Sequence, residues 1–227
     1  MPGRSLIEED LVLPPENFSM IEPGVYRSAF PRGKNQSFLL RLGIKTIIPL
    51  VPEEYPVAMA DFCARNNIKL VDICGTDGNK WPFKEIDEEV LKRALFYVMH
   101  TNDKQGYEYR PCLIHCNKGK HRTGSLAGCI RKLRNWSMSS IVTEYLSFAN
   151  PKARLEDQRF IDTFDPLEFT SSMNKYHDEV LALEKMKVVA VTSIIPTKKV
   201  EKERDSDKPQ IPGDEADKPS KLLSIKD

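Results

Sequence analysis

The sequence predicts an α/β domain in which helices flank a mostly parallel sheet. Short apolar segments rich in β-branched residues alternate with segments of helical periodicity, a pattern typical of parallel strands joined by helical crossovers. The predicted strands are Val25–Ser28, Ile44–Val51, Ile68–Ile73 and Pro111–His115. The predicted helices are Lys34–Leu42, Val57–Asn66, Ile86–His100, Gly124–Leu133, one that begins after Ser137, one near 153–164 and a peripheral one within Asp165–Lys187. With 227 residues, the chain is long enough for one domain with a substantial core.

Each predicted strand is a short apolar run bounded by residues that end strands. Ile44–Val51 is β-branched and apolar, and it stands between Gly43 and Pro52. Pro111–His115 is a second clear case. In parallel sheets, ligands bind beyond the carboxyl ends of the strands. We therefore expect a functional site directly after Pro111–His115.

The predicted helices carry apolar residues on one face. In Ile86–His100 the apolar residues recur at helical spacing and form one stripe. Ser137 is a suitable cap for the helix that follows it, in which Ile141, Tyr145 and Phe148 face the core.

The ends of the chain differ in composition from its middle. We predict a flexible N-terminal segment over residues 1–16, one folded domain over 17–187 and a disordered tail over 188–227. The tail consists largely of Lys, Glu, Asp, Pro and Ser, and it cannot bury enough apolar surface to fold. Its longest apolar stretch, near Val188–Ile195, is too short to insert into a membrane.

The net charge and the cysteine content indicate which cellular compartment and which classes of partner the chain favours. The net charge is +1, so no overall field favours nucleic acid. Five cysteines without paired spacing, and an acidic N-terminus unlike a secretory leader, argue against a disulfide framework. We expect a reducing, cytoplasmic location, with access to the nucleus left open.

The run HCNKGKHRTG at residues 115–124 carries the chemistry. It has the form HC-x5-R-T-G and lies between a predicted strand and a predicted helix. A loop in this position can aim several backbone N–H groups inward and hold a phosphate-sized anion, helped by the helix dipole. Gly119 relieves the steric limit where the loop curls. The predicted phosphate-binding residues are Asn117, Lys118, Gly119, Lys120 and His121.

Cys116 and Arg122 are the predicted catalytic pair. Cys116 stands at the base of the loop, where N–H groups and cations favour its thiolate, a good nucleophile toward phosphorus. The planar guanidinium of Arg122 can hold two phosphate oxygens at once, which a lysine cannot. Thr123 can hydrogen-bond the sulfur as it leaves, and His115 is expected to orient the loop rather than act as a base.

Two simpler interpretations of the motif are weaker. A lone cysteine is more often an inert buried thiol, but here an arginine six residues later and an internal glycine accompany it. His115, Cys116 and His121 cluster in the sequence, yet no CxxC or HxxxH spacing accompanies them. We therefore expect neither a metal nor another cofactor.

A basic rim around the loop would suit a substrate with many phosphates. Lys80, Lys152 and Arg154 join the cations of the loop if the fold brings these segments together, although each lysine alone is more simply a solvated charge. Asp77 lies in the glycine-rich interval 75–81, predicted as a loop, and is our candidate general acid, with Asp72 as the alternative.

The motif resembles the signature of the plant-and-fungal atypical dual-specificity phosphatases, and the resemblance covers residues 14–165. Further matching segments are Asn17–Met20, Gly24–Ser28, Leu50–Pro56, Gly78–Lys80, Pro82–Phe83, Gly128–Leu133, Pro151–Arg154 and Asp157–Phe160. The resemblance implies the cysteine-phosphatase fold and removal of the β-phosphate from soluble inositol pyrophosphates, chiefly at the 5-position. The sequence differs from the pattern of this family at Asp77, Trp81 and Ser125.

Three functions stay open at this point. The first is hydrolysis of inositol pyrophosphates through a phosphocysteine. The second is dephosphorylation of tyrosine or of serine and threonine in phosphoproteins by the same residues. The third is a non-catalytic phosphate-binding module, against which the presence of both Cys116 and Arg122 argues.

Overall fold

The strand before the motif forms the centre of the sheet. This strand, β7 (Cys112–Cys116), pairs in parallel with β2 (Val25–Ala29) on one side and with β3 (Thr46–Pro49) on the other. β4 (Lys69–Leu70) pairs in parallel with β3, and β1 (Ser19–Glu22) adds an antiparallel edge beside β2. The predicted α/β class with a mostly parallel sheet is confirmed.

The computed structural model describes residues 12–71, 73, 87–102, 106–173, 176–178 and 182. Asp77, Lys80 and the whole of the predicted tail therefore lie outside the described residues, as do residues 1–11 of the predicted N-terminal segment. Residues 12–16 of that segment contact the domain, since Pro15 is buried and the Glu16 carbonyl accepts a hydrogen bond from the Ala29 N–H at 2.7 Å.

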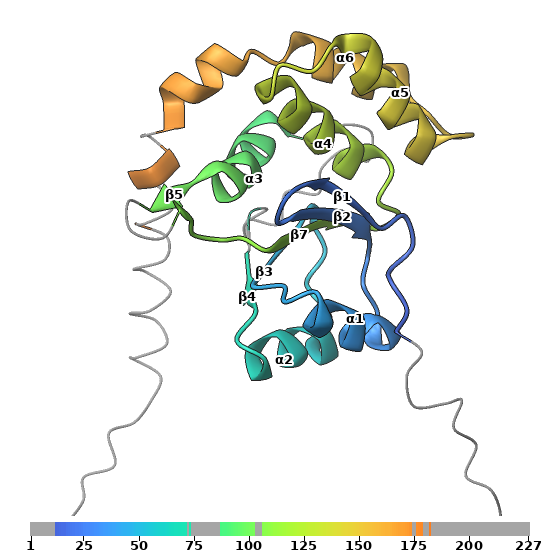
Figure 1. Cartoon of the computed structure of the whole chain (residues 1–227), viewed down its shortest axis with the longest axis vertical. Coiled ribbons are helices and arrows are strands. Elements are labelled where there is room, and N and C mark those ends of the chain that lie inside the picture. The colour runs from blue at the N-terminus through green and yellow to red at the C-terminus, as the bar shows by residue number, and fades with distance from the viewer. Residues whose placement is uncertain are drawn as a thin grey trace, which may run out of the picture. The chain divides into compact units, whose positions relative to one another are not determined.

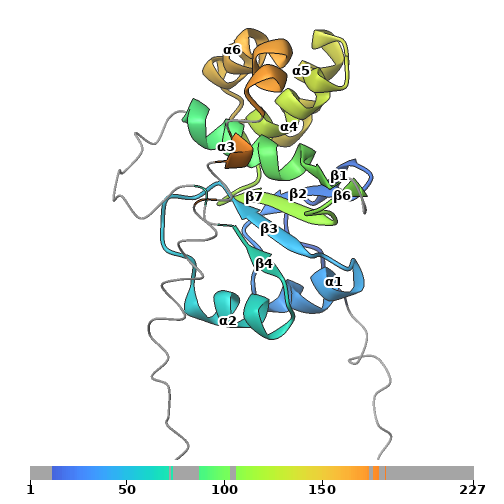
Figure 2. The same cartoon turned by 90° about the vertical axis from the view of Figure 1, so that its left-hand side faces the viewer.

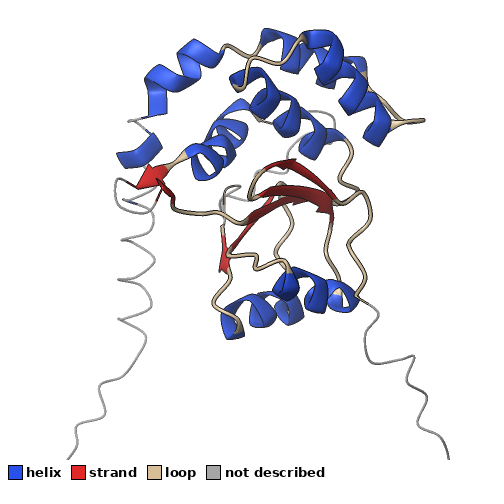
Figure 3. Cartoon of the chain, viewed as in Figure 1, coloured by secondary structure: helices blue, strands red, loops and turns tan. Residues whose placement is uncertain are grey.

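Helices cover both faces of the sheet (Figure 1). On one face lie α1 (Gln36–Arg41), preceded by η1 (Gly33–Asn35), and α2 (Val57–Arg65). On the other lie α3 (Glu88–Met99) and α4 (His121–Leu133), with α5 (Met138–Ala149) and α6 (Leu155–Thr163) packed outside α4. The view in Figure 2 shows the same layers from the side, and Figure 3 separates the helices from the strands by colour. A small two-stranded ribbon, β5 (Thr101–Asn102) with β6 (Gly106–Tyr107), stands apart.

The core consists of two apolar layers, one on each face of the sheet. Side chains alternate along a strand, so neighbouring residues of β7 enter different layers. Leu113 packs with the residues of α1 and α2, and Ile114 packs with those of α3 and α4. This burial on both faces explains why the segments Ile44–Val51 and Pro111–His115 consist mostly of consecutive apolar residues.

The helix after the motif begins earlier than predicted. We expected it from Gly124, but α4 begins at His121, so Arg122 and Thr123 lie on its first turn. No side chain caps this helix, and the sequence therefore lacks the usual signal for its start. Farther along, a Cβ on Gly128 would stand 2.5 Å from Ile161 Cδ1, so the glycine lets α6 approach α4 closely.

Ser137 does cap α5, as predicted, because its side chain accepts a hydrogen bond from the Ser140 N–H. The helical segment at 166–173 falls within the predicted peripheral helix. Across the described ranges, no helix combines the length and the apolar character needed to cross a bilayer.

Candidate active site: a phosphate loop beyond the central strand

In the loop after β7, the carbonyl groups of residues 117–119 accept hydrogen bonds from outside the loop. Three donors bind three consecutive carbonyls: the Phe30 N–H binds Asn117 O at 3.4 Å, Asn17 Nδ2 binds Lys118 O at 2.8 Å and Arg27 Nη2 binds Gly119 O at 3.0 Å. In a trans peptide the C=O and the next N–H point in opposite directions. The N–H groups of residues 118–120 therefore face the opposite, concave side of the loop. Such a set of N–H groups suits an anion.

Gly119 is required for this shape. Its φ of 66° lies in the left-handed region. A Cβ there would stand 2.5 Å from the backbone carbon of Ser28 and 2.6 Å from the Ala29 nitrogen. The loop thus lies directly on the backbone at the end of β2, and no larger residue fits between them.

Cys116 is the last residue of β7 and is 4% exposed at the base of the loop. The other three described cysteines lie elsewhere in the core and are free. Burial raises the pKa of Cys63 to about 11 and of Cys112 to about 12, and it raises the pKa of Cys129 further. These three thiols stay protonated at neutral pH and are unsuited to nucleophilic attack.

Arg122 extends from the first turn of α4 toward the end of β3. Its Nη1 donates to the carbonyl of Leu50 at 2.7 Å, which fixes the direction of the guanidinium. Thr123, the next residue, is fully buried, and its Oγ1 forms no hydrogen bond within the part of the chain that the structure describes. The predicted contact of Thr123 with the sulfur is therefore a prediction for the reacting complex.

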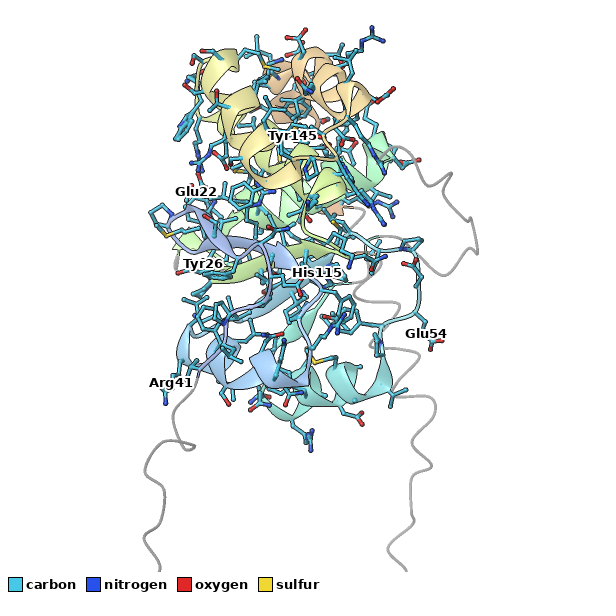
Figure 4. The ribbon with its side chains drawn as sticks, turned by 90° about the vertical axis from the view of Figure 1, so that its right-hand side faces the viewer. Glu22, Tyr26, Arg41, Glu54, His115 and Tyr145 are labelled. Carbon is cyan, nitrogen blue, oxygen red and sulfur yellow. The ribbon has the colours of Figure 1, made fainter. Side chains whose placement is uncertain are left out.

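His115 lies in the interior of the sheet (Figure 4). Its Nε2 is 3.2 Å from the hydroxyl of Tyr55, and its ring meets that of Phe30 edge-on, with the centroids 4.9 Å apart. Burial, together with the nearby charge of Arg122, lowers the pKa of His115 to about 3. The imidazole is therefore neutral at physiological pH, as an orienting role requires.

The segment between α5 and α6 lies against the phosphate loop. Lys120 Nζ donates to the carbonyl of Asn150 at 3.0 Å, and His121 Nε2 is 2.6 Å from the carbonyl of Lys152. The structure thus brings the segment that carries Lys152 and Arg154 against the loop. Lys118 and Lys152 are exposed, whereas Arg154 is half-buried. Lys80 and the acid candidates Asp77 and Asp72 lie outside the described residues.

A buried tyrosine and a buried carboxylate anchor this segment. The Tyr145 hydroxyl donates to Asp157 Oδ2 at 2.5 Å and accepts from the Arg154 N–H at 3.1 Å. Asp157 is 4% exposed, and burial raises its pKa. Our sequence analysis did not assign a role to Tyr145 beyond the core.

Sequence reasoning also missed Arg27 and Tyr55 at this site. Both lie far from the motif in the sequence, and each reaches it only through the fold. Arg27 did carry a signal, since a charged residue inside an otherwise apolar strand must find a partner when the strand is buried. Tyr55 carried none, because nothing in the order of residues places it beside His115.

The geometry agrees with comparisons to known proteins. A model of the tyrosine phosphatase family matches residues 12–182. The chain belongs to this family. The resemblance stated from the sequence is therefore confirmed, and so is the cysteine-phosphatase fold.

Several relatives of this chain carry the name inositol diphosphatase. The chain is 48% identical over 165 residues to the inositol diphosphatase SIW14 of Saccharomyces cerevisiae, in a match that covers 72% of this chain and 56% of the yeast protein. It is 44% identical to the inositol diphosphatase DSP4 of Arabidopsis thaliana, over 72% of this chain and 82% of that protein. Among solved structures, the Siw14 catalytic core is 47% identical, with a TM-score of 0.64 over 74% of this chain and 96% of that one.

Proposed function

We propose that this protein hydrolyses the β-phosphate of soluble inositol pyrophosphates, chiefly the 5-diphosphate, through a phosphocysteine intermediate. The observation that carries the proposal is the phosphate loop itself. Cys116 stands at its base, three outward-bonded carbonyls turn the next N–H groups to the concave side, and Arg122 follows on the first turn of α4.

The reaction has two displacements at phosphorus. The Cys116 thiolate attacks the terminal phosphorus, the S–P bond forms, and the bridging P–O bond breaks with its electrons on the departing inositol phosphate. Water then attacks the phosphocysteine, the S–P bond breaks to restore the thiolate, and inorganic phosphate leaves with the oxygen of the water. Arg122 and the loop N–H groups hold the equatorial oxygens through both steps.

The basic rim supports a substrate with many phosphates. Lys118 and Lys152 are exposed on neighbouring segments at the edge of the loop, which favours a highly anionic ligand. The solved yeast relative is described as a PP-IP phosphatase and is 46% identical to this chain. We further propose a cytoplasmic location, because a nucleophilic thiol requires reducing surroundings.

A pyrophosphate substrate also reduces the need for a general acid. A departing phosphate leaves without protonation far more readily than a tyrosine or serine oxygen does. We expect Asp77→Asn to retain most of the pyrophosphatase activity while losing most of the activity on phosphotyrosine peptides. A parallel loss on both substrates would show that Asp77 protonates both leaving groups and would refute this explanation of the preference.

The deciding experiment measures phosphate release by wild type and Cys116→Ser without added metal. The substrates are 5-diphosphoinositol pentakisphosphate and a panel of phosphotyrosine peptides at equal concentration. We expect a much higher kcat/KM on the pyrophosphate and complete loss of turnover in Cys116→Ser. Preference for the peptides would make the protein a protein phosphatase, and binding without turnover of either substrate would make it a phosphate-binding module.

A further inference from the structure

A fully buried arginine lies beneath the phosphate loop. Arg27 is the third residue of β2, and its side chain is 1% exposed. Its neighbour Tyr26, labelled in Figure 4, packs with Phe18 on the face covered by α1 and α2. Because side chains alternate across a strand, Arg27 points to the opposite face, toward α4 and α5. Charged side chains are rarely buried to this extent unless they are paired.

One N–H of Arg27 shapes the loop directly. Its Nη2 donates to the carbonyl of Gly119 at 3.0 Å, the outward-bonded carbonyl closest in sequence to Arg122. The same peptide carries the N–H of Lys120, which this bond turns to the concave side. Loss of the bond would free that peptide to rotate and would remove a donor from the anion-binding surface.

The charge of Arg27 is only partly neutralised. Glu144 Oε1 is 3.8 Å from Nη1, too far for a hydrogen bond, and the same carboxylate accepts a shorter bond of 2.8 Å from Arg131 Nε. The guanidinium carbon lies 3.8 Å from the centre of the Phe148 ring. Nε and Nη1 have no hydrogen-bond partner among the described residues. Positive charge therefore remains in the interior beside the loop.

The remaining charge interacts with Cys116. Burial lowers the pKa of Arg27 to about 10, and the negative charges of Glu144 and Cys116 oppose that shift. Arg27 stays protonated at neutral pH. Arg27 lies on β2 two residues before Ala29, which pairs with Cys116 of β7, and charges in the interior interact more strongly than they do in water.

We propose that Arg27 is a positioning residue that holds the phosphate loop in its anion-binding shape and supplies a buried positive charge to the thiolate of Cys116. This inference rests on the proposed phosphatase function. Arg122 touches the phosphate itself, whereas Arg27 acts from below, through the Gly119 carbonyl and through its field. The two arginines would thus have separable effects on binding and on the reactivity of the sulfur.

The test compares Arg27→Met and Arg27→Lys with wild type. The first readout is the rate of Cys116 alkylation by iodoacetamide as a function of pH, and the second is kcat and KM for a chromogenic aryl phosphate. We expect Arg27→Met to move the alkylation profile toward higher pH. We also expect it to lower kcat by about 10- to 100-fold, with a smaller change in KM. Arg27→Lys restores the charge, so it should recover the alkylation profile more fully than kcat.

Arg110→Met is the matched control. The Arg110 side chain is 8% exposed, pairs with Glu22 and lies 3.5 Å from the centre of the Tyr107 ring, but it precedes β7 at the end of the strand away from the loop. We expect this variant to lose stability without any change in the alkylation profile. An alkylation profile of Arg27→Met that coincides with those of wild type and Arg110→Met would overturn the proposal.

A second variant tests the effect of the Arg27 charge on Cys116 if Arg27→Met does not fold. Glu144→Gln removes the carboxylate that offsets the charge of Arg27, so the pH of half-maximal alkylation should fall. A rise would contradict the proposed direction of the field. Alkylation and aryl phosphate turnover do not depend on the natural substrate. A failure of 5-diphosphoinositol pentakisphosphate as substrate would therefore refute the proposed function while leaving this inference to its own readouts.

Discussion

The phosphate loop is held differently on its two sides. On the β2 side it lies on backbone atoms, with Gly119 in contact with Ser28 and Ala29 and the buried Arg27 on its carbonyl. On the side of the α5–α6 segment, the side chains of Lys120 and His121 reach carbonyls at the surface. Backbone packing fixes a shape, whereas long side chains at a surface adjust to a ligand. We infer that the β2 side governs catalysis and that the α5–α6 side governs affinity.

Gly119→Ala should have the largest effect, because it disrupts the backbone packing on the β2 side of the loop. The new Cβ would overlap the backbone of β2 and would require a left-handed backbone, so we expect destabilisation by about 3 kcal/mol. The loop N–H groups would also move, and kcat/KM for an aryl phosphate should fall by about 1000-fold. Urea unfolding and steady-state kinetics measure the two effects. Gly33→Ala, which has open space around it, should change neither.

The basic rim formed by Lys118 and Lys152 should respond through affinity. Replacing the exposed Lys118 and Lys152 together with Gln should raise KM for 5-diphosphoinositol pentakisphosphate by about 10-fold, with kcat nearly unchanged, because two attractive charges are lost. The salt dependence of KM should weaken as well. Lys45→Gln, at the amino end of β3, is the control and should behave as wild type. An equal rise of KM for an aryl phosphate, which has a single phosphate, would show that the two lysines do not bind the additional phosphates of the inositol substrate.

Tyr145→Phe tests whether the α5–α6 side acts on affinity alone, since it loosens this segment without touching the loop. It removes the hydroxyl that binds Asp157 and Arg154, so the buried carboxylate of Asp157 loses a hydrogen-bond donor. We expect a loss of about 2 kcal/mol in unfolding free energy and a rise of about 3-fold in KM, with kcat retained. A fall in kcat larger than the rise in KM would mean that this segment also shapes the loop.

The buried His115 should make the free energy of unfolding depend on pH. Its pKa is about 3 in the folded protein, against 6.5 for an unperturbed histidine. Between these values the unfolded chain binds the extra proton, so stability falls as the pH drops below about 6.5. The slope attributable to this residue is about 1.4 kcal/mol per pH unit. Urea unfolding between pH 7 and pH 5 should show a shallower pH dependence in His115→Gln, and an identical dependence would show that other groups account for it.

The sequence predicted those parts of the molecule that local rules decide. Short apolar runs predicted the strands β3 and β7, and the HC-x5-R-T-G motif lies, as predicted, directly after the central strand at the carboxyl edge of the sheet. That this edge is a functional site stays a prediction. The antiparallel edge strand β1 was missed, because Ser19–Glu22 has mixed polarity and gains its pairing only from β2.

The support of the site depends on contacts between distant residues, and no local rule reveals these. Arg27 and Gly119 are 92 residues apart in the sequence, and Tyr55 and His115 are 60 apart. A sequence pattern predicts the residues that face the phosphate, but it could not identify the residues that hold them in place. The same limit explains why the start of α4 was placed at Gly124, since its first turn is fixed by the loop rather than by a cap.

The order of strands in the sheet has a consequence for biosynthesis. β2 and β3 are made early and do not pair with each other, and β7, which joins them, is made more than 60 residues after β3 ends. A ribosome that has completed only the first 110 residues therefore carries a chain whose two central strand edges are open. Such edges invite pairing with other chains. Insertion of a single strand closes both edges and, in the same event, positions Cys116, so a truncated translation product has neither a complete sheet nor the proposed phosphate site.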